Sequence, residues 1–463
     1  MGWEKLSILG RSKMNISVIG LGKLGAVMAA VFADKGNTVH GVDVNSLTVD
    51  AINAGRAPVQ EPGLDQLIRK NQRRLSATTN CAEAVAATSI TFIILPTPSD
   101  ASGAFSLDYV LPQVRVIGEA LRAKKNFHLV VLSSTVMPGA TGDLLRPLLE
   151  ETSGKTCGQD FGLCYNPEFI ALGSVIRDMS NPDMILIGES DPRSGQMLAD
   201  LYGQVCENRP PIARMNFVNA EVTKLSINTF VTTKISYANM LAQLCEQLPG
   251  ADVEVVTAAL GLDSRIGRKY LTGALGYGGP CFPRDNVAFA RLARQNGMEA
   301  TLAEATEQVN RRQAPRLGEL ILALLPKGGT AGILGLAYKP ATSVVDESQG
   351  SAVAQYLVAK GVPVAVYDPA AMENARRHLG SGVTFANSLH ECAAQSHVLA
   401  ITTPWDEFRS LQPGSLNTTL GRPAIIDCWR ILSRQNFEAV ADYLTLGVGP
   451  RQNAGRLIES AVV

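Results

Sequence analysis

A short apolar strand that runs directly into a glycine-rich turn and then a helix is the feature that most restricts how this chain can fold. Asn15–Ile19 form the apolar run, and Gly20-Leu21-Gly22-Lys23-Leu24-Gly25 follows at once. The next segment, 26–35, is rich in Ala, Val, Met and Phe and is closed by Gly36, which is typical of a capped helix. Thr38–Val42 has the composition of a second strand. These segments predict a βαβ unit, the start of a doubly wound sheet.

The three glycines of the turn match the dinucleotide-binding pattern GxGxxG. Gly20 would permit a tight turn, Gly22 would let the backbone approach a pyrophosphate, and Gly25 would let helix and strand pack closely. The helix N terminus would offer N–H groups to the phosphates. Asp43 lies 18 residues after Gly25, where its carboxylate can accept both ribose hydroxyls and would repel a 2′-phosphate. The pattern predicts an NAD site; a glycine turn without a ligand is the alternative, and neither names a substrate.

The remaining segments predict two α/β parts separated by a helical part. Strand-like segments recur at 90–95, 128–132 and 184–187, and again at 331–336, 362–369, 397–402 and 424–427. Between these groups, 219–247 carries apolar residues at helical spacing, which predicts one long helix. We expect an α/β fold with two Rossmann-like doubly wound domains joined by a long central helix and a helical region. The predicted domain bounds are 14–210, 211–312 and 313–463.

Composition excludes several classes of protein. The chain has 463 residues, of which 46% are hydrophobic and 18% charged, so it can form two or three cores and is not wholly disordered. Its 42 basic residues balance 42 acidic ones, which argues against a nucleic-acid partner. No long apolar run or secretion signal is present, so we expect a cytoplasmic protein without a membrane span. The eight scattered cysteines, and the lack of a fourth ligand near His390, Cys392 and His397, predict neither disulfides nor a metal.

The segment 276–285 is the most unusual in the chain, with three glycines and two prolines in ten residues. Such a loop can press its backbone against a ligand. Cys281 is followed by Arg284 and Asp285, and a cationic neighbour favours a nucleophilic thiolate. A lone cysteine is also commonly a small buried hydrophobe, and the loop by itself leaves both interpretations open.

One face of the predicted long helix carries polar residues. Glu221, Lys224 and Asn228 fall at i, i+3 and i+7. An ammonium and an amide one turn apart can stabilise an oxyanion, which favours the nucleophile interpretation of the cysteine loop. On an ordinary surface helix the same three residues would be solvated.

Several motifs occur in one order along the chain. They are the glycine fingerprint, Ser134-Thr135-Val136 with Pro138-Gly139, Asn166-Pro167-Glu168-Phe169, the helix of Lys224 and Asn228, the segment 278–285, Leu334-Gly335-Leu336-Ala337-Tyr338-Lys339-Pro340 and Trp405-Asp406-Glu407-Phe408. Together they resemble the UDP-glucose/GDP-mannose dehydrogenase family of nucleotide-sugar oxidoreductases. The resemblance extends from Met14 to about Arg430. The cysteine loop and the Asn-Pro-Glu-Phe segment are specific, whereas the glycine fingerprint is not.

The resemblance implies an NAD-dependent, four-electron oxidation of the C6 alcohol of a nucleotide sugar to a uronic acid. Cys281, as a thiolate, would add to the intermediate aldehyde and give a thiohemiacetal. A second oxidation would leave a thioester that water hydrolyses. We expect UDP-glucose as the substrate, with GDP-mannose or a UDP-N-acetylhexosamine as alternatives. Two further alternatives are a nucleotide-sugar-binding paralogue with impaired catalysis and a plain hydroxyacid dehydrogenase, which would leave the cysteine loop unexplained.

The resemblance also implies roles for five residues beside the nucleophile. Lys224 and Asn228 match the oxyanion stabilisers of the family. Glu168 matches its base for thioester hydrolysis, and Thr135 and Asp285 match residues that order water or relay a proton.

Binding residues follow from the same motif positions. The implied cofactor-binding residues are Gly20, Gly22, Lys23, Leu24, Gly25, Asp43, Pro96, Thr97, Pro98, Ser134, Thr135 and Arg284. The implied substrate-binding residues are Glu168, Phe169, Ile170, Lys224, Arg265, Tyr270, Gly278, Lys339 and Arg430. Arg265 resembles a family arginine that reaches the substrate across a dimer interface, so a homodimer is the smallest expected unit.

The chain departs from the family pattern at four places. Asp346-Glu347-Ser348 stands where Arg-Glu-Ser is usual, Leu172 replaces a glutamate, Pro404 replaces the glutamate of Thr-Glu-Trp, and Thr48 replaces a basic residue. These departures bear on cofactor affinity and substrate detail more than on the reaction class. A carboxylate facing a pyrophosphate would repel it, so we expect either a loop that turns Asp346 to solvent or a weakened NAD site.

Overall fold

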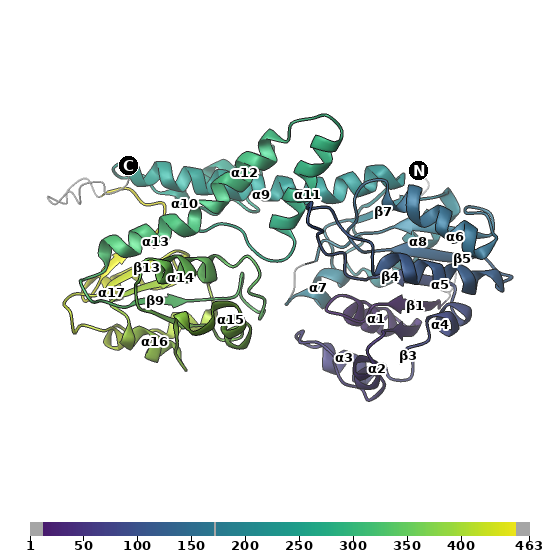
Figure 1. Cartoon of the computed structure of the whole chain (residues 1–463), viewed down its shortest axis with the longest axis horizontal. Coiled ribbons are helices and arrows are strands. Elements are labelled where there is room, and N and C mark those ends of the chain that lie inside the picture. Colours follow the sequence, from purple (N-terminus) through teal and green to yellow (C-terminus); the bar gives the residue numbers. More distant parts are fainter. Residues whose placement is uncertain (1–12, 171–172, 451–463) are drawn as a thin grey trace, which may run out of the picture. The chain divides into compact units, whose positions relative to one another are not determined.

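The computed structural model describes residues 13–170 and 173–450. They fall into two compact units that divide between Leu225 and Ser226, within one long helix. Each unit is built on its own sheet (Figure 1).

Within the described residues, the first unit holds an eight-stranded sheet in the order β3-β2-β1-β4-β5-β6-β7-β8. The first six positions follow the 3-2-1-4-5-6 order of dinucleotide-binding folds. Neighbouring strands are parallel except β6 and β7, which are antiparallel. The strands are β1 (Asn15–Ile19), β2 (Thr38–Val42), β3 (Leu75–Thr78), β4 (Ile90–Ile93), β5 (His128–Leu132), β6 (Phe161–Tyr165), β7 (Ile185–Glu189) and β8 (Ile212–Met215).

Helices cover both faces of this sheet. They are α1 (Gly25–Asp34), α2 (Ser46–Asn53), α3 (Leu64–Lys70), α4 (Cys81–Ala87), α5 (Val110–Arg122), the π-helix η1 (Ala140–Leu145), α6 (Arg146–Ser153), α7 (Val175–Ser180), α8 (Pro192–Val205) and the start of α9 (Phe217–Gln247). One core lies between the sheet and α1, α3, α7 and α8, and the other lies between the sheet and α4, α5 and α6.

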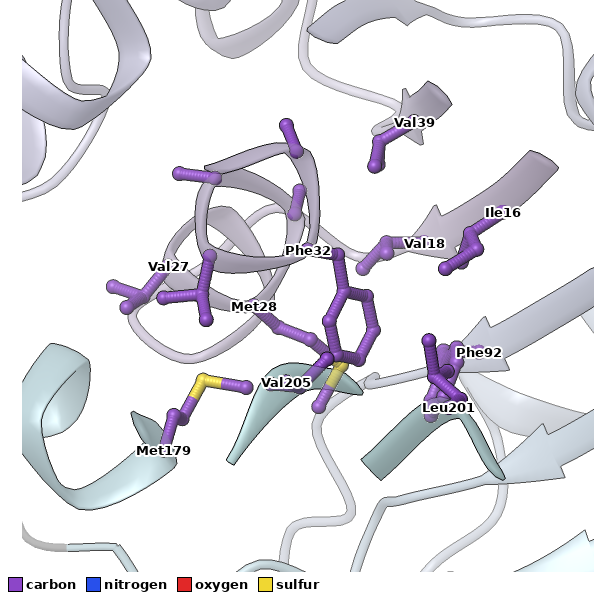
Figure 2. Packing of buried hydrophobic residues seen from close by; sticks show 14 of the residues in the cluster. Ile16, Val18, Val27, Met28, Phe32, Val39, Phe92, Met179, Leu201 and Val205 are labelled. Atoms are coloured by element: carbon purple, nitrogen blue, oxygen red, sulfur yellow. The ribbon is translucent and has the colours of Figure 1, made fainter. Parts of the chain in front are cut away.

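Helix α1 lies in the centre of the first core. It is apolar on all sides, and every residue from Gly25 to Ala33 is buried. Figure 2 shows Phe32 of α1 beside Phe92 of β4, and their ring centroids are 5.0 Å apart. Met179 and Val205 close the core from the side of α7 and α8. This packing fixes the N terminus of α1 relative to the carboxyl ends of the strands.

The second unit, as far as the structure describes it, holds a six-stranded parallel sheet in the order β11-β10-β9-β12-β13-β14. Counted within the unit this is again the order 3-2-1-4-5-6. The strands are β9 (Ala331–Leu334), β10 (Val364–Tyr367), β11 (Thr384–Phe385), β12 (Val398–Ile401), β13 (Ala424–Asp427) and β14 (Asp442–Leu444). The helices are α10 (Val253–Leu262), α11 (Phe282–Gln295), α12 (Thr301–Arg311), α13 (Gln313–Leu324), α14 (Gln349–Ala359), α15 (Met372–Leu379), η2 (Gly380–Gly382), α16 (Leu389–Gln395), η3 (Asp406–Ser410), η4 (Pro413–Ser415) and α17 (Arg434–Glu438).

The predicted fold class is confirmed: both sheets are doubly wound, and the long helix predicted at 219–247 is α9, Phe217–Gln247. The helical stretch predicted to reach Arg312 is divided into α11 and α12. The division into 14–210, 211–312 and 313–463 stays a prediction; the two compact units divide inside its middle part, between Leu225 and Ser226. Across the described ranges, no helix is both long and apolar enough to cross a membrane.

Candidate active site

In the glycine turn after β1, Gly20 and Gly25 are crowded by neighbouring atoms, and Gly22 faces open space. Gly20 has a φ of +94°, and a Cβ there would lie 2.2 Å from the carbonyl oxygen of Ile94. A Cβ at Gly25 would lie 1.8 Å from the carbonyl oxygen of Gly20. A Cβ at Gly22 would meet no described atom within 4 Å. The fold itself requires glycine at the first and third positions, whereas the open space at Gly22 fits a ligand that approaches the backbone.

The N terminus of α1 faces the same turn, and no side chain of the described residues caps it. Its N–H groups fit the phosphates of a dinucleotide. Asp43 at the end of β2 is half-buried, and its Oδ2 accepts a hydrogen bond from the N–H of Leu21 at 2.8 Å. Its Oδ1 accepts one from the N–H of Asn45 at 2.9 Å. The carboxylate is therefore fixed beside the turn, and each oxygen keeps acceptor capacity for a ribose hydroxyl.

The loops after β4 and β5 are tied together. The hydroxyl of Thr97 donates to the carbonyl oxygen of Thr135 at 2.7 Å. The hydroxyl of Ser134 donates to the carbonyl oxygen of Leu95 at 2.7 Å and accepts from its N–H at 2.9 Å. Strand β4 pairs in parallel with β1 on one side and with β5 on the other, so their loops and the glycine turn lie at one edge of the sheet. Pro96 and Pro98, on either side of the buried Thr97, are exposed there.

Glu168 and Lys224 meet beyond the end of β6. The ammonium group of Lys224 donates to the backbone oxygen of Glu168 at 2.6 Å and lies 4.6 Å from the ring centroid of Phe169. Burial raises the pKa of Glu168 to about 7, opposed by the Lys224 charge and by a hydrogen bond from Tyr202. A carboxyl group that titrates near neutral pH is suited to act as a general base. Tyr202, on α8, is a site residue that sequence reasoning missed, because no motif contains it.

Glu221 is a structural residue and not part of a solvated face. Its side chain is fully buried, with Oε2 accepting from the N–H of Gly139 at 2.7 Å and Oε1 from the N–H of Thr141 at 2.9 Å. The carboxylate thereby ties the loop that follows Thr135 to the turn of α9 that carries Lys224. The three-residue polar face expected from the sequence thus includes one residue with a different role.

In the second unit, Cys281 precedes the first turn of α11 and is exposed. The alternative of a small buried hydrophobe is therefore wrong. Asp285, in the first turn of that helix, is 1% exposed, and its Oδ2 accepts from the side-chain amide of Asn228 at 2.6 Å. The guanidinium Nε of Arg284 lies 3.8 Å from the other oxygen of Asp285. A thiol at a helix N terminus is favoured as thiolate by the helix dipole.

The segment after β9 holds the cysteine loop. The N–H of Gly279 donates to the carbonyl oxygen of Asp346 at 2.9 Å. A Cβ at Gly278 would lie 2.2 Å from the carbonyl oxygen of Glu347, and a Cβ at Gly279 would lie 2.6 Å from the ring of Tyr338. The two glycines therefore allow a close approach that side chains would block. The side chain of Asp346 is exposed, and the choice between a loop turned to solvent and a weakened NAD site stays open.

The other predicted substrate residues of the second unit have different surroundings. Arg265 is highly exposed and paired with Asp263 at 2.6 Å. Tyr270 has a φ of +66°, and its ring meets that of Phe282 edge to face. Arg430 donates to Oδ1 of Asp252 at 2.7 Å, and it donates to the carbonyl oxygen of Leu446 at 3.0 Å. Lys339 lies 5.9 Å from the ring centroid of Tyr338. The binding roles of these residues stay predictions.

Of the departures from the family pattern, Leu172 lies outside the described residues. Thr48 lies in the first turns of α2. Pro404 lies between Thr403 and Trp405. The hydroxyl of Thr403 donates to the carbonyl oxygen of Ala337 at 2.7 Å.

The second sheet repeats the glycine turn in a closed form. Gly335 has a φ of +107°, and a Cβ at Gly350 would lie 2.0 Å from its carbonyl oxygen. Asp368 stands where Asp43 stands in the first sheet, but it is 1% exposed and its Oδ2 accepts from the N–H groups of Leu336 and Ala337. The indole of Trp405 donates to the same oxygen. With its acceptor sites filled, this carboxylate is not placed to bind a ribose.

The histidines considered for a metal site have other partners. His390 Nδ1 is 2.9 Å from the hydroxyl of Ser415, and His397 Nδ1 accepts from the N–H of Thr330 at 3.0 Å. Cys392 is fully buried. In the described part of the chain, no group of three or more His, Cys, Asp or Glu side chains is arranged to hold a metal ion.

Comparisons with known proteins all find similarity to nucleotide-sugar dehydrogenases. Models of the UDP-glucose/GDP-mannose dehydrogenase family match the chain: the NAD binding domain over residues 14–206, the central domain over 218–312 and the UDP binding domain over 332–434. The chain is 36% identical to UDP-glucose 6-dehydrogenase AglM of Haloferax volcanii, over 91% of this chain and 98% of that protein. It is 35% identical to GDP-mannose 6-dehydrogenase of Azotobacter vinelandii, over 82% of this chain and 87% of that protein. A solved UDP-glucose dehydrogenase from Pyrobaculum islandicum has a TM-score of 0.84 and 37% identity, covering 95% of this chain and 99% of that one.

The open space at Gly22 yields a prediction for cofactor binding. Gly22→Ala should leave the thermal unfolding of the ligand-free protein unchanged, because the added methyl group meets no atom, and should weaken NAD binding about tenfold, equivalent to about 1.4 kcal/mol. Gly20→Ala is the matched control and should lower the unfolding temperature without ligand, because of its positive φ and the Ile94 contact. Calorimetric titration with NAD and a melting curve measure both. Unchanged NAD affinity in Gly22→Ala would place the pyrophosphate elsewhere.

Proposed function

We propose, on the premise that this chain belongs to the UDP-glucose/GDP-mannose dehydrogenase family, that it oxidises UDP-glucose at C6 to UDP-glucuronate in two NAD-dependent steps. The family resemblance of the sequence is confirmed, and the chain is an NAD-dependent oxidoreductase of this family. The choice of UDP-glucose is supported by relatives named UDP-glucose 6-dehydrogenases, at 36% identity in Haloferax volcanii and in Rhizobium meliloti.

The observation that carries the proposed mechanism is the exposed Cys281 at the start of α11, with the Asn228–Asp285 pair in the same unit. A two-electron oxidation of an alcohol to an aldehyde requires no nucleophile. In a four-electron oxidation a nucleophile can hold the aldehyde covalently until the second oxidation. The open turn at Gly22, the uncapped N terminus of α1 and Asp43 fit NAD. NAD, when bound, accepts a hydride from the sugar in each oxidation.

The residues of the chain perform the covalent steps. The Cys281 thiolate forms a bond to the aldehyde carbon, and the carbonyl electron pair moves to the oxygen. The Lys224 ammonium and the Asn228 amide stabilise that oxyanion. After the second oxidation, Glu168 takes a proton from water as the water oxygen bonds to the thioester carbon. The carbon–sulfur bond then breaks, and Cys281 leaves as thiolate, ready for the next cycle.

The stoichiometry of the reaction tests this proposal. With UDP-glucose as limiting substrate, two NADH should form per sugar nucleotide consumed, and little free aldehyde should accumulate, because the cysteine holds the intermediate. Absorbance at the NADH band and mass analysis of the product measure both. GDP-mannose and UDP-N-acetylhexosamines, tested in parallel, should react more slowly. A ratio of one NADH with free aldehyde would reduce the activity to a simple alcohol oxidation, and faster turnover of another sugar nucleotide would replace UDP-glucose as substrate.

The nucleophile has its own test. Cys281→Ser should abolish steady turnover and leave NAD and substrate affinity within about twofold, because serine keeps the size of the side chain but offers no accessible anion. Lys224→Ala should reduce turnover by about 10²–10³-fold, the range for loss of one oxyanion stabiliser. Near wild-type turnover in Cys281→Ser would exclude the thioester route. Cys245→Ser, which replaces a buried cysteine of α9, is the control.

We propose further that the protein is a homodimer that uses α9. Phe230, Tyr237 and Leu244 follow one another at seven-residue spacing and therefore share one face of the helix. They are 68%, 47% and 54% exposed, and an exposed apolar row of this kind is typical of an interface. A second copy is the proposed occupant, because Arg265 is expected to reach the substrate of a partner subunit.

The dimer is tested by mass in solution. The double variant Phe230→Glu and Leu244→Glu should shift the protein from dimer to monomer in light scattering, because two charges would be buried on the shared face. Leu47→Glu, at a 75% exposed position of α2, should remain a dimer. A wild-type protein that is monomeric at micromolar concentration would contradict the proposal.

A further inference from the structure

A buried polar cluster lies behind Glu168 in the first unit. Tyr202 of α8 is 3% exposed, and its hydroxyl oxygen lies 2.5 Å from Oδ1 of Asn166 and 3.4 Å from Oε1 of Glu168. Asn166 is 2% exposed and stands two residues before Glu168, just after β6. The tyrosine hydroxyl therefore lies between an amide oxygen and the carboxyl group proposed as the base.

The orientation of Asn166 decides what the hydroxyl can do. The side-chain nitrogen of Asn166 donates to the carbonyl oxygen of Leu186 at 2.9 Å, so its oxygen points to Tyr202 and can only accept. The tyrosine has a single proton and faces two acceptors. When Glu168 is a carboxylate, the proton of Tyr202 can turn to it. When Glu168 is protonated, its own O–H can donate to the Tyr202 oxygen, whose proton then goes to Asn166.

We propose that Tyr202 is a positioning residue for Glu168: its hydroxyl, held by Asn166, orients the carboxyl group and supports the ionised form that accepts a proton from water. The inference rests on the function proposed for Glu168 and deepens it. Tyr202 itself stays neutral throughout, and the proton that leaves water ends on Glu168.

The charges around Glu168 are consistent with this role. The titratable groups that face it are Tyr202 and Cys206 from α8 and its end, and Lys224 from α9. Burial and the nearby carboxylate keep the pKa of Tyr202 well above its ordinary range, so it retains its proton. Burial raises the pKa of Cys206 to about 11, so this thiol is neutral at physiological pH. Lys224 donates to the backbone oxygen of Glu168 and its charge lowers the pKa of the carboxyl group, while the Tyr202 hydroxyl contacts the carboxyl oxygen Oε1.

Tyr202→Phe tests the proposal, because it removes the hydroxyl and keeps the ring. A hydrogen bond to the carboxylate lowers the pKa of Glu168, so its loss should raise that pKa by about one unit. The acid limb of the pH profile of uronate formation should move to higher pH by the same amount. The KM for the sugar nucleotide and the rate of the first NADH burst should stay unchanged, since neither needs Glu168 as a base.

Tyr443→Phe is the matched control. Tyr443 is a buried tyrosine of the second unit whose hydroxyl donates to Asp427 at 2.7 Å, so its loss reproduces a missing buried hydroxyl away from Glu168. This variant should keep the wild-type pH profile. A pH profile of Tyr202→Phe that coincides with that of wild type would overturn the proposal, and so would an equal shift in Tyr443→Phe.

A direct titration separates this inference from the proposed function. The infrared band of the protonated Glu168 carboxyl, assigned by its loss in Glu168→Gln, can be followed against pH without substrate. Its midpoint should rise in Tyr202→Phe. If wild type oxidises no sugar nucleotide but the midpoint rises, the proposed function fails and the link between Tyr202 and Glu168 stands. If turnover is normal and the midpoint is unchanged, the function stands and the role of Tyr202 is refuted.

Discussion

The site of the first unit depends on the close contact between α1 and the turn that precedes it. The carbonyl oxygen of Gly20 approaches Gly25 so closely that any Cβ would overlap it. This contact brings the N terminus of α1 against the carboxyl end of β1, where partial positive charge and unpaired N–H groups are directed at the same point. Since α1 is buried on all sides, the contact is held by the packing of the whole core.

The two sheets share one architecture, but they differ in whether the acidic residue after the second strand can accept the ribose of a dinucleotide. Both have a left-handed glycine after the first strand and a second glycine pressed on its carbonyl oxygen. They differ at the acidic residue after the second strand. Asp43 is half-buried with one donor on each oxygen, whereas Asp368 is buried and also accepts from the N–H groups of Ala370 and Ala371. Carboxylate lone pairs that backbone donors occupy are not available to a ligand.

The acidic side chains near the proposed chemistry are buried to different degrees. Glu221 and Asp285 are buried with hydrogen-bonding partners, as a buried carboxylate requires. Burial still raises the pKa of Glu221 despite these partners, and it raises the pKa of Glu168 to about 7. Folding therefore favours its protonated form. The stability from this residue is present below the unfolded pKa of about 4.3 and is lost as pH rises through about 7. The same raised pKa makes the Glu168 carboxylate a stronger base toward water at neutral pH than an ordinary glutamate.

The sequence by itself determined the elements and the motifs. Asn15–Ile19, Thr38–Val42 and α9 could be predicted because their apolar spacing and flanking glycines are local properties. The short strands β3 (LSAT) and β14 (DYL) were missed because they carry few apolar residues, whereas the equally short but apolar β4 (ITFI) was predicted. The motif residues were found because each motif lies within a short stretch of sequence. The residues that hydrogen-bond to them, such as Tyr202, could not be found in this way.

Only the tertiary structure decided which side chains meet. In the folded chain Cys281 is exposed, and the Glu221 carboxylate accepts a hydrogen bond from the N–H of Gly139. The hydroxyl of Tyr202 lies beside the carboxyl group of Glu168. Glu221 and Gly139 are 82 residues apart in the chain, and Tyr202 and Glu168 are 34 apart. A hydrogen bond between such residues has no local signature, because its geometry exists only after the helices have packed on the sheet. Burial, which sets the pKa of Glu168, is likewise a property of the packed core and not of any one segment.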